Sequence, residues 1–195
     1  MQVKLTMSTP EIEISNSAKI CYASSGTKDI TSSLVHERNH LSVLRFAYAS
    51  FRIEGISRSC ANQLVRSSFL QFLQESMRYV DSDKGGFEFI MPEGLDDMAK
   101  DTMTKHWELS VSRYKWLRDH GVKKEDARAV LPMNTSTKIN VSGNLQAYMD
   151  FMKLRLTSHS QLEIRNVAKQ MYMLLAQKFP QVFTEELFEK LKQGK

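Results

Sequence analysis

The chain has 195 residues, of which 42% are hydrophobic and 25% are charged, and its formal net charge is +5. This composition is typical of an ordinary globular domain and argues against wholesale disorder, and no apolar run approaches the roughly 18 residues of a membrane-spanning helix. The basic residues are spread along the chain without a dense run, so a nucleic acid polymer is not the expected partner.

The cysteines and the N-terminus narrow the class further. The two cysteines, Cys21 and Cys60, form no Cys-x-x-Cys pair, so neither a disulfide framework nor a zinc site is expected. The first six residues lack the apolar region of a secretory signal, which favours a cytoplasmic location without membrane attachment. We therefore expect a single domain over residues 1–195 and no metal site.

The first third of the chain is expected to alternate strands and helices. Residues 10–22 contain Ile12 and Ile14 in alternation with Glu11 and Glu13, which predicts a strand, and a helix is expected over residues 32–40. Residues 46–54 alternate again and predict a half-buried strand, with its apolar face formed by Ala47, Ala49, Phe51 and Ile53.

Gly55 breaks this strand, and Ser57 can cap a following helix that brings Gln63 and Arg66 to its C-terminal end. Residues 81–86 are predicted to form a loop. Further along we expect a strand over 87–91, a long helix over 95–120, a short helix over 125–130, a strand over 135–141, and helices over 144–156, 159–179 and 184–192. Strands come first and helices dominate later, which predicts an α+β fold with a mostly antiparallel sheet and several long helices.

The densest group of polar side chains lies between Gln63 and Tyr79. Arginine and amide side chains in this segment are suited to binding a phosphate and the amide edge of a base, and they are accompanied by Glu75 and Ser76. The alternative is that Arg66 and Arg78 are solvated residues around a helix end, since surface arginines are common.

Two later arginines are also candidates. Arg128 is near the end of a short helix, where a cation is favoured by the helix dipole alone. Arg155 lies on the same helical face as Asn144, Tyr148 and Phe151, a face about 16 Å long. Tyr148 and Phe151 are expected in the core, and a cation on such a face needs a partner, for which Glu163 is a candidate.

The sequence contains none of the motifs of common hydrolases and nucleotide-binding folds. Gly-x-Ser-x-Gly, a phosphate-binding P-loop, His-Glu-x-x-His and Gly-x-Gly-x-x-Gly are all absent. A cysteine nucleophile is also not expected, because Cys60 falls in a probable packed helix and Cys21 has no histidine close in sequence.

Several separated blocks resemble the flavin-dependent thymidylate synthases. The segment SFRIEGISRSCANQLVRSSFLQFLQESMRYV is similar to that family's central block, in which Glu-Gly-Ile-Ser-Arg precedes Gln-x-x-Arg-His-Arg and Ser-x-Arg-Tyr. Residues 39–44, 127–132 and 159–164 resemble further blocks in the same order, together with Asn144, Phe151, Leu154 and Arg155. The similarity spans roughly residues 40–165.

This resemblance implies an activity and a set of ligands. The family implies a homotetramer that binds FAD between subunits and methylates dUMP, with methylenetetrahydrofolate as carbon donor and NADPH as reductant. Position by position, it assigns dUMP contacts to Gln63, Ser76, Arg78, Arg128 and Arg155. It assigns FAD contacts to His40, Ser42, Arg66, Asn144 and His159. Arg155 and Ser76 would act in the reaction itself, with Arg155 stabilising negative charge on the uracil ring.

The sequence departs from the family pattern at several positions. Arg66-Ser67-Ser68 replaces Arg-His-Arg, Leu73-Gln74 replaces Asn-Glu, and Arg45-Phe46 replaces Glu-His. Gln146 and Asp150 stand where an arginine and an asparagine are frequent. Three hypotheses therefore remain open: an active enzyme that makes dTMP, in which Arg45 replaces a lost cation; a relative that modifies another pyrimidine nucleotide, for example by hydroxymethylation of dUMP or dCMP; and a non-catalytic paralogue that binds a nucleotide or a protein partner.

Overall fold

A four-stranded antiparallel sheet lies at the centre of a computed structural model that describes residues 1–21, 23, 25–80 and 86–194. The strands are β1 (Gln2–Ser8), β2 (Tyr48–Ser57), β3 (Gln71–Gln74) and β4 (Ser136–Asn144), in the spatial order β1-β2-β4-β3. Each neighbouring pair is antiparallel, so the predicted α+β fold with an antiparallel sheet is confirmed.

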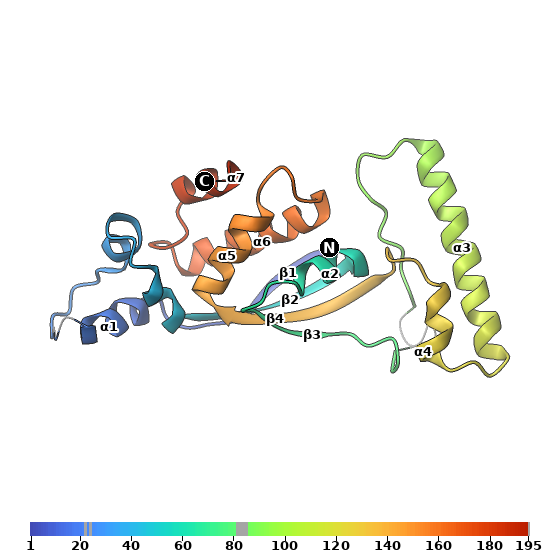
Figure 1. The fold of residues 1–195 in the computed structure, drawn as a ribbon, viewed down its shortest axis with the longest axis horizontal. Helices are drawn as coiled ribbons and strands as arrows, with labels where there is room; N and C mark the ends of the chain where they lie inside the picture. Colours follow the sequence, from blue (N-terminus) through green and yellow to red (C-terminus); the bar gives the residue numbers. More distant parts are fainter. Residues whose placement is uncertain (22, 24, 81–85, 195) are drawn as a thin grey trace.

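The helices gather on one face of the sheet and at its two ends (Figure 1). α2 (Arg58–Leu64), α5 (Leu145–Arg155), α6 (Leu162–Lys178) and α7 (Glu185–Lys192) lie on one side. α1 (Ile12–Cys21) lies at one end, with a π-helical turn (Ser33–Glu37) and the 3-10 helix η2 (Leu41–Phe46). α3 (Asp97–Asp119), α4 (Lys124–Ala127) and the 3-10 helix η4 (Arg128–Val130) lie at the other end.

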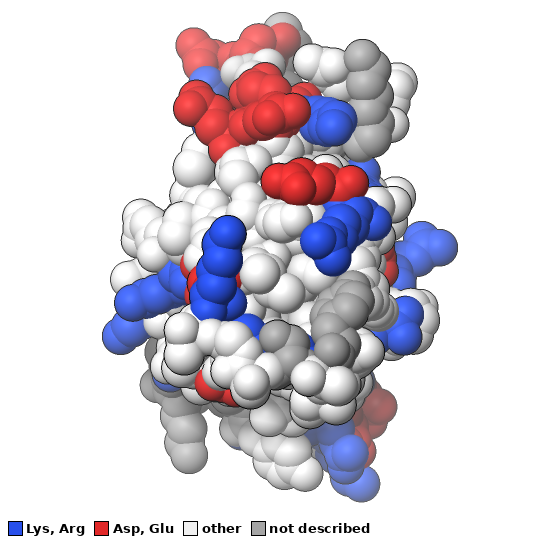
Figure 2. Space-filling model, turned by 90° about the vertical axis from the view of Figure 1, so that its left-hand side faces the viewer, with Lys and Arg blue, Asp and Glu red and all other residues white. Residues whose placement is uncertain are grey.

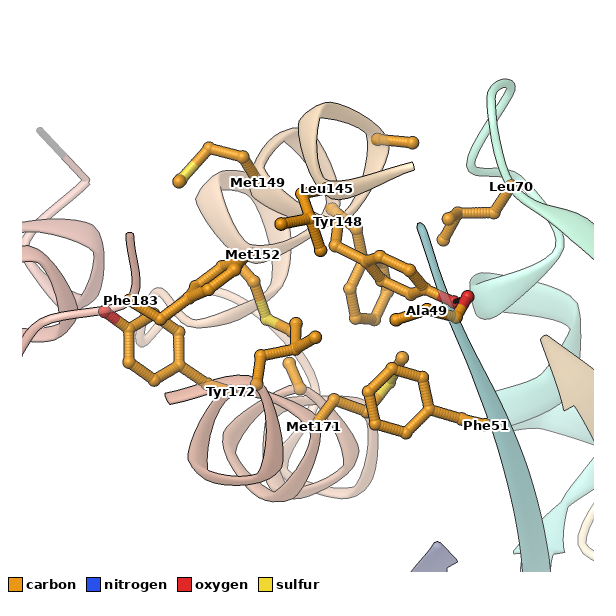
Figure 3. Close-up of a cluster of buried hydrophobic side chains, with 14 of the residues drawn as sticks. Ala49, Phe51, Leu70, Leu145, Tyr148, Met149, Met152, Met171, Tyr172 and Phe183 are labelled. Carbon is orange, nitrogen blue, oxygen red and sulfur yellow. Dashed lines mark hydrogen bonds between the residues drawn. The ribbon is translucent and has the colours of Figure 1, made fainter. Parts of the chain in front are cut away.

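The core lies between β2, β4 and the helices above them. Ala49, Phe51 and Ile53 alternate along β2 and are fully buried, as the pattern of residues 46–54 predicts. Tyr148 of α5 packs edge-on against Phe51, with 5.3 Å between ring centroids, and its hydroxyl donates to the Ala49 carbonyl (Figure 3). This packing fixes α5 on the sheet and confirms Tyr148 and Phe151 as core residues.

Polar side chains and the exposed Leu73 line the opposite face of the sheet, over which Figure 1 shows no helix of the described residues. Arg52 of β2 and Leu73 of β3 both pair with Asn140 of β4, so the three side chains point to this face. The face is hollowed by a cavity of about 500 Å³. Among the residues that the structure describes, helices therefore cover one side of the sheet only.

The predicted strand within residues 10–22 is wrong, because Ile12–Cys21 form helix α1. The buried side chains Ile14 and Ala18 are four residues apart and form one helical face, which packs beside η2. The alternation of Ile12 and Ile14 is too short to distinguish a strand from a helix, and Pro10 before the helix suits its start.

Four other expectations need correction. Gly55 does not end the strand, because β2 continues through an irregularity between Glu54 and Ile56 to Ser57. Residues 87–91 form only an isolated bridge between Phe89 and Thr135, and residues 32–40 contain the short π-helical turn instead of a regular helix. Strands β1 and β3 were not expected from the sequence; both lie at edges of the sheet, where one neighbour provides the pairing. The predicted loop at 81–86 lies, except for Gly86, outside the described residues.

The helices in the second half follow the sequence closely. α3 begins at Asp97 with Asp96 as its cap and ends before Gly121, whose φ of 83° is the left-handed conformation that glycine adopts easily. α5 and α7 begin after the capping residues Asn144 and Thr184. None of the helices in the described part of the chain is long and apolar enough to cross a membrane.

Candidate active site

Helix α2 carries Gln63 and lies between the sheet and the corner where α5 meets α6. Its N-terminus is capped by Ser57, whose Oγ accepts a hydrogen bond from the Cys60 amide at 2.9 Å, as the sequence predicts. At its other end, the Gln63 carbonyl accepts from Arg155 Nη2 at 2.9 Å, and the Gln63 side chain donates to Gln161. Gln63 and Arg155, predicted from separate segments, are thus brought together.

Arg155 is not paired with Glu163. Both oxygens of Glu163 accept hydrogen bonds from Ser57, and Arg155 uses the Gln63 carbonyl instead. The buried Nε of Arg155 has no hydrogen-bond partner in the described residues. Burial lowers the pKa of Arg155, and the nearby charge of Arg66 lowers it further. Arg66 and Arg155 are neighbouring guanidinium groups without a carboxylate partner among the described residues, and such a pair favours an anionic ligand.

A second group of cations lies at the Ser136 end of β4. Glu125 joins Arg78 and Arg128: its side chain accepts from Arg78 Nε at 2.7 Å, and its carbonyl accepts from Arg128 Nε at 3.0 Å. Ser76 is in the adjacent turn, where its Oγ accepts from the Arg78 amide at 3.3 Å and its own hydrogen remains available to donate. The predicted residues Ser76, Arg78 and Arg128 therefore share one surface.

Arg58 belongs to the same group, although sequence reasoning gave it no role. It lines a cavity of about 340 Å³ with Arg128, Asn62 and Gln74, and its buried Nε lacks a partner within the described residues. Burial lowers the pKa of Arg58, Glu75 raises it, and Arg128 lowers it. The signal was present in the sequence, because Arg58 ends the matched Glu-Gly-Ile-Ser-Arg segment.

Three of the other predicted residues, His40, Ser42 and Asn144, lie at the Asn144 end of β4. His40 precedes η2, which contains Ser42, and η2 is held against the start of α5 by a 2.9 Å bond from the Leu145 amide to the Ala47 carbonyl. Residues 66–70 approach from the other side: a Cβ at position 143 would lie 2.5 Å from Leu70 Cδ2, so Gly143 permits this close contact. Phe69 and Leu70 thus lie beside Gly143, which precedes Asn144, and Ser67 and Ser68 come just before them in the sequence.

Asn144 also has a structural role at this end, as the capping residue of α5. Its side-chain oxygen accepts from the Ala147 amide at 2.9 Å and caps α5, which leaves its Nδ2 to donate elsewhere. Two residues that depart from the family pattern pair with each other close by, because Gln146 Nε2 donates to Asp150 at 3.1 Å. The replacements at 146 and 150 therefore form one compatible pair.

The group of residues at the Ser136 end of β4 and the group at its Asn144 end are far apart within one chain. β4 has nine residues, so its ends are roughly 26 Å apart at about 3.3 Å per residue. Gln63, Arg66 and Arg155 lie on the helix-covered side, and the exposed His159 lies in the turn between α5 and α6. The site residues predicted from sequence thus form separate groups rather than one pocket in a single chain.

The distribution of charge does not suggest a nucleic acid track on the face with α1. Figure 2 shows acidic side chains gathered at one end of this face and lysine and arginine side chains standing apart over the rest. Continuous basic surfaces are typical of proteins that bind nucleic acid polymers. The clusters that favour anions are the small groups around Arg128 and Arg155.

Comparison with known proteins identifies the family of this chain. The family model described as thymidylate synthase complementing protein matches residues 3–181. A flavin-dependent thymidylate synthase of Geobacter sulfurreducens is 34% identical over 95% of this chain and 86% of its own length. Those of Pyrococcus furiosus and Mycolicibacterium gilvum are 38% and 34% identical over 71% and 75% of this chain, which spans 59% and 64% of their lengths, less than two thirds. The chain belongs to the flavin-dependent thymidylate synthases, a family of enzymes.

Proposed function

We propose that this protein converts dUMP to dTMP by FAD-dependent reductive methylation, with methylenetetrahydrofolate as carbon donor and NADPH as reductant. The observation that carries the proposal is the convergence of Arg58, Arg78 and Arg128 at the Ser136 end of β4, in a family of thymidylate synthases. A nucleotide monophosphate is the anion that such a cluster suits, because guanidinium groups make charge-assisted bonds to phosphate oxygens.

The residues on the nucleotide side have separable roles. Arg78 and Arg128 bind the phosphate, and Ser76 donates its hydroxyl hydrogen to a phosphate oxygen or to the reacting nucleotide. Gln63 offers an amide that can pair with the uracil edge. Arg155, whose Nε has no partner among the described residues, stabilises negative charge that develops on the uracil ring.

The residues of the Asn144 end fit a flavin dinucleotide. Asn144 Nδ2, the Ser42 hydroxyl and the His40 ring can donate hydrogen bonds, and the exposed Arg45 of η2 provides positive charge for a pyrophosphate. The close packing at Gly143 brings Phe69 and Leu70 beside this surface. When bound, the flavin would supply the hydride that reduces the transferred methylene group to methyl.

Assembly of more than one copy is part of the proposal. The two groups of residues lie at opposite ends of β4, and one face of the sheet is free of helices in the described residues. A homotetramer with FAD between subunits would bring the Asn144 end of one copy to the Ser136 end of another. Sedimentation of the purified protein tests this, and a monomer at assay concentration would contradict it.

Product analysis tests the reaction directly. We expect dTMP from dUMP when FAD, methylenetetrahydrofolate and NADPH are all present, detected by mass spectrometry, and no product when any one of them is left out. A parallel reaction with dCMP tests the alternative nucleotide. A hydroxymethylated product, or no product together with no flavin absorbance in FAD-saturated protein, would overturn the proposal.

A further inference from the structure

Helix α2 is held at both ends by the corner between α5 and α6. At its N-terminal end, Glu163 accepts hydrogen bonds from the Ser57 amide at 2.7 Å and from Ser57 Oγ at 2.6 Å. At its C-terminal end, Arg155 donates to the Gln63 carbonyl at 2.9 Å, and Gln161 accepts from the Gln63 side chain. Both ends of α2 are thus fixed by three residues that lie within nine positions of one another in the sequence, Arg155, Gln161 and Glu163.

The hydrogen bonds between Ser57 and Glu163 hold α2 more strongly than those at Gln63. Ser57 is fully buried, and its hydroxyl donates to Glu163 while the same oxygen accepts from the Cys60 amide at 2.9 Å. Hydrogen bonds to a carboxylate are shorter and stronger than those between neutral groups, and a negative charge is favourable at a helix N-terminus. Glu163 therefore acts on α2 through its cap.

α2 depends on such ties because it has only seven residues. Helices of this length are not stable on their own, so tertiary contacts set the place and direction of α2. The residue whose placement matters most is Gln63, whose backbone and side chain both contact the same corner. A shift at Ser57 would be transmitted along one rigid helix to Gln63.

We propose that Glu163 is a positioning residue of the reaction, which sets the place of Gln63 through Ser57 and α2 without touching a ligand. The role of Gln63 in binding uracil rests on the proposed function. If Glu163 had only a structural role, its substitution would lower the overall stability, and its effect on dUMP binding would not depend on Gln63. The proposal requires instead that Glu163 and Gln63 act on the same step of nucleotide binding.

A double-mutant cycle on the full chain separates the two roles. In Glu163→Gln, an NH₂ group replaces one of the two oxygens that accept hydrogen bonds from Ser57, so one of these bonds is lost. The affinity for dUMP, measured by calorimetry, should then fall about tenfold. In the Gln63→Ala background, the same change should alter dUMP affinity by less than about twofold, since Gln63 no longer contributes. Equal losses in both backgrounds would overturn the proposal.

Glu93→Gln is the matched control. Glu93 lines the same cavity of about 380 Å³ as Glu163, but its carboxylate accepts from Asn166 and makes no hydrogen bond to α2 within the described residues. We expect this variant to bind dUMP as the wild type does. If Glu163→Gln does not fold, Ser57→Ala takes its place in the cycle, because it removes the hydroxyl while keeping the amide bond to Glu163.

Hydrogen exchange gives a readout without any ligand. Amides of residues 58–66 should exchange at least about threefold faster in Glu163→Gln than in the wild type and in Glu93→Gln, while α6 is unchanged. Unchanged exchange over 58–66 would contradict the positioning role. If the wild type binds no dUMP, the proposed function fails, and the exchange rates alone then decide whether Glu163 positions α2.

Discussion

The two ends of β4 differ in how well they keep the chemistry of the family. At the Ser136 end, Arg78 and Arg128 are present and converge on Glu125, and Arg58 lines the adjacent cavity. At the Asn144 end, the serines Ser67 and Ser68 stand where the family has a histidine and an arginine. Nucleotide binding and flavin binding can therefore be tested separately in this protein, by substituting residues at one end of β4 at a time.

Removing a cation from the Ser136 end should have the largest effect. Arg128→Ala removes charge-assisted bonds worth about 1.5 to 3 kcal/mol, so dUMP affinity should fall roughly 10- to 150-fold. Flavin affinity should change by less than about twofold, because the proposed contacts of Arg128 are to the phosphate of dUMP and those of FAD are to residues of the Asn144 end. Calorimetry with dUMP and visible absorbance with FAD measure the two quantities.

The control for this prediction is Arg113→Ala, which removes an exposed arginine of α3. It should leave both affinities unchanged. Loss of flavin with normal dUMP binding in Arg128→Ala would reverse the assignment of the two ends.

Restoring the family residues at the Asn144 end should have an intermediate effect. Ser67→His combined with Ser68→Arg should tighten FAD binding about tenfold. The gain is smaller than for a buried arginine bound to a phosphate, because Ser68 is exposed and solvent screens the charge. Flavin fluorescence quenching measures this affinity. We expect dUMP affinity in the absence of flavin to change less than about twofold.

If the double variant binds FAD no better than the wild type, the missing histidine and arginine do not limit flavin binding. Another residue, such as the exposed Arg45 of η2, would then supply the lost charge.

Asn144 should show the smallest effects, and two substitutions separate its duties. Asn144→Asp keeps an oxygen that accepts from the Ala147 amide, so the free energy of unfolding should hardly change, while loss of the Nδ2 donor weakens FAD binding a few-fold. Asn144→Ala should lose the same FAD contact and also about 1 kcal/mol of stability. Urea unfolding measures the second effect.

Equal stability of the Asp and Ala variants would show that the cap of α5 contributes nothing. Unchanged FAD binding in both would remove Asn144 from the flavin site.

Sequence patterns predicted the parts of this fold that depend on local chemistry. The alternation in β2, the Ser57 cap of α2 and the limits of α3 all follow from short stretches of sequence. The pairing of β1 and β3 depends on strands distant in the sequence, and residues 10–22 contain two isoleucines that fit either a strand or a helix. Local patterns do not resolve such cases.

The candidate site shows the same division. The resemblance supplied Gln63, Arg78, Arg128 and Arg155, whose motifs are contiguous or regularly spaced. It did not supply Arg58 as a neighbour of Arg128, nor Ser57 as the partner of Glu163, because both contacts join segments more than 60 residues apart. Such contacts become visible only when the sheet and the α5–α6 corner are assembled.

The independence of the two ends can be tested most directly by titrating dUMP into protein stripped of flavin and into FAD-saturated protein. We expect dUMP to bind with similar affinity in both cases, and Arg128→Ala to weaken binding in both by the same factor. If dUMP bound to only one of the two forms, or if Arg128→Ala weakened binding by clearly different factors, the two ends would not be independent.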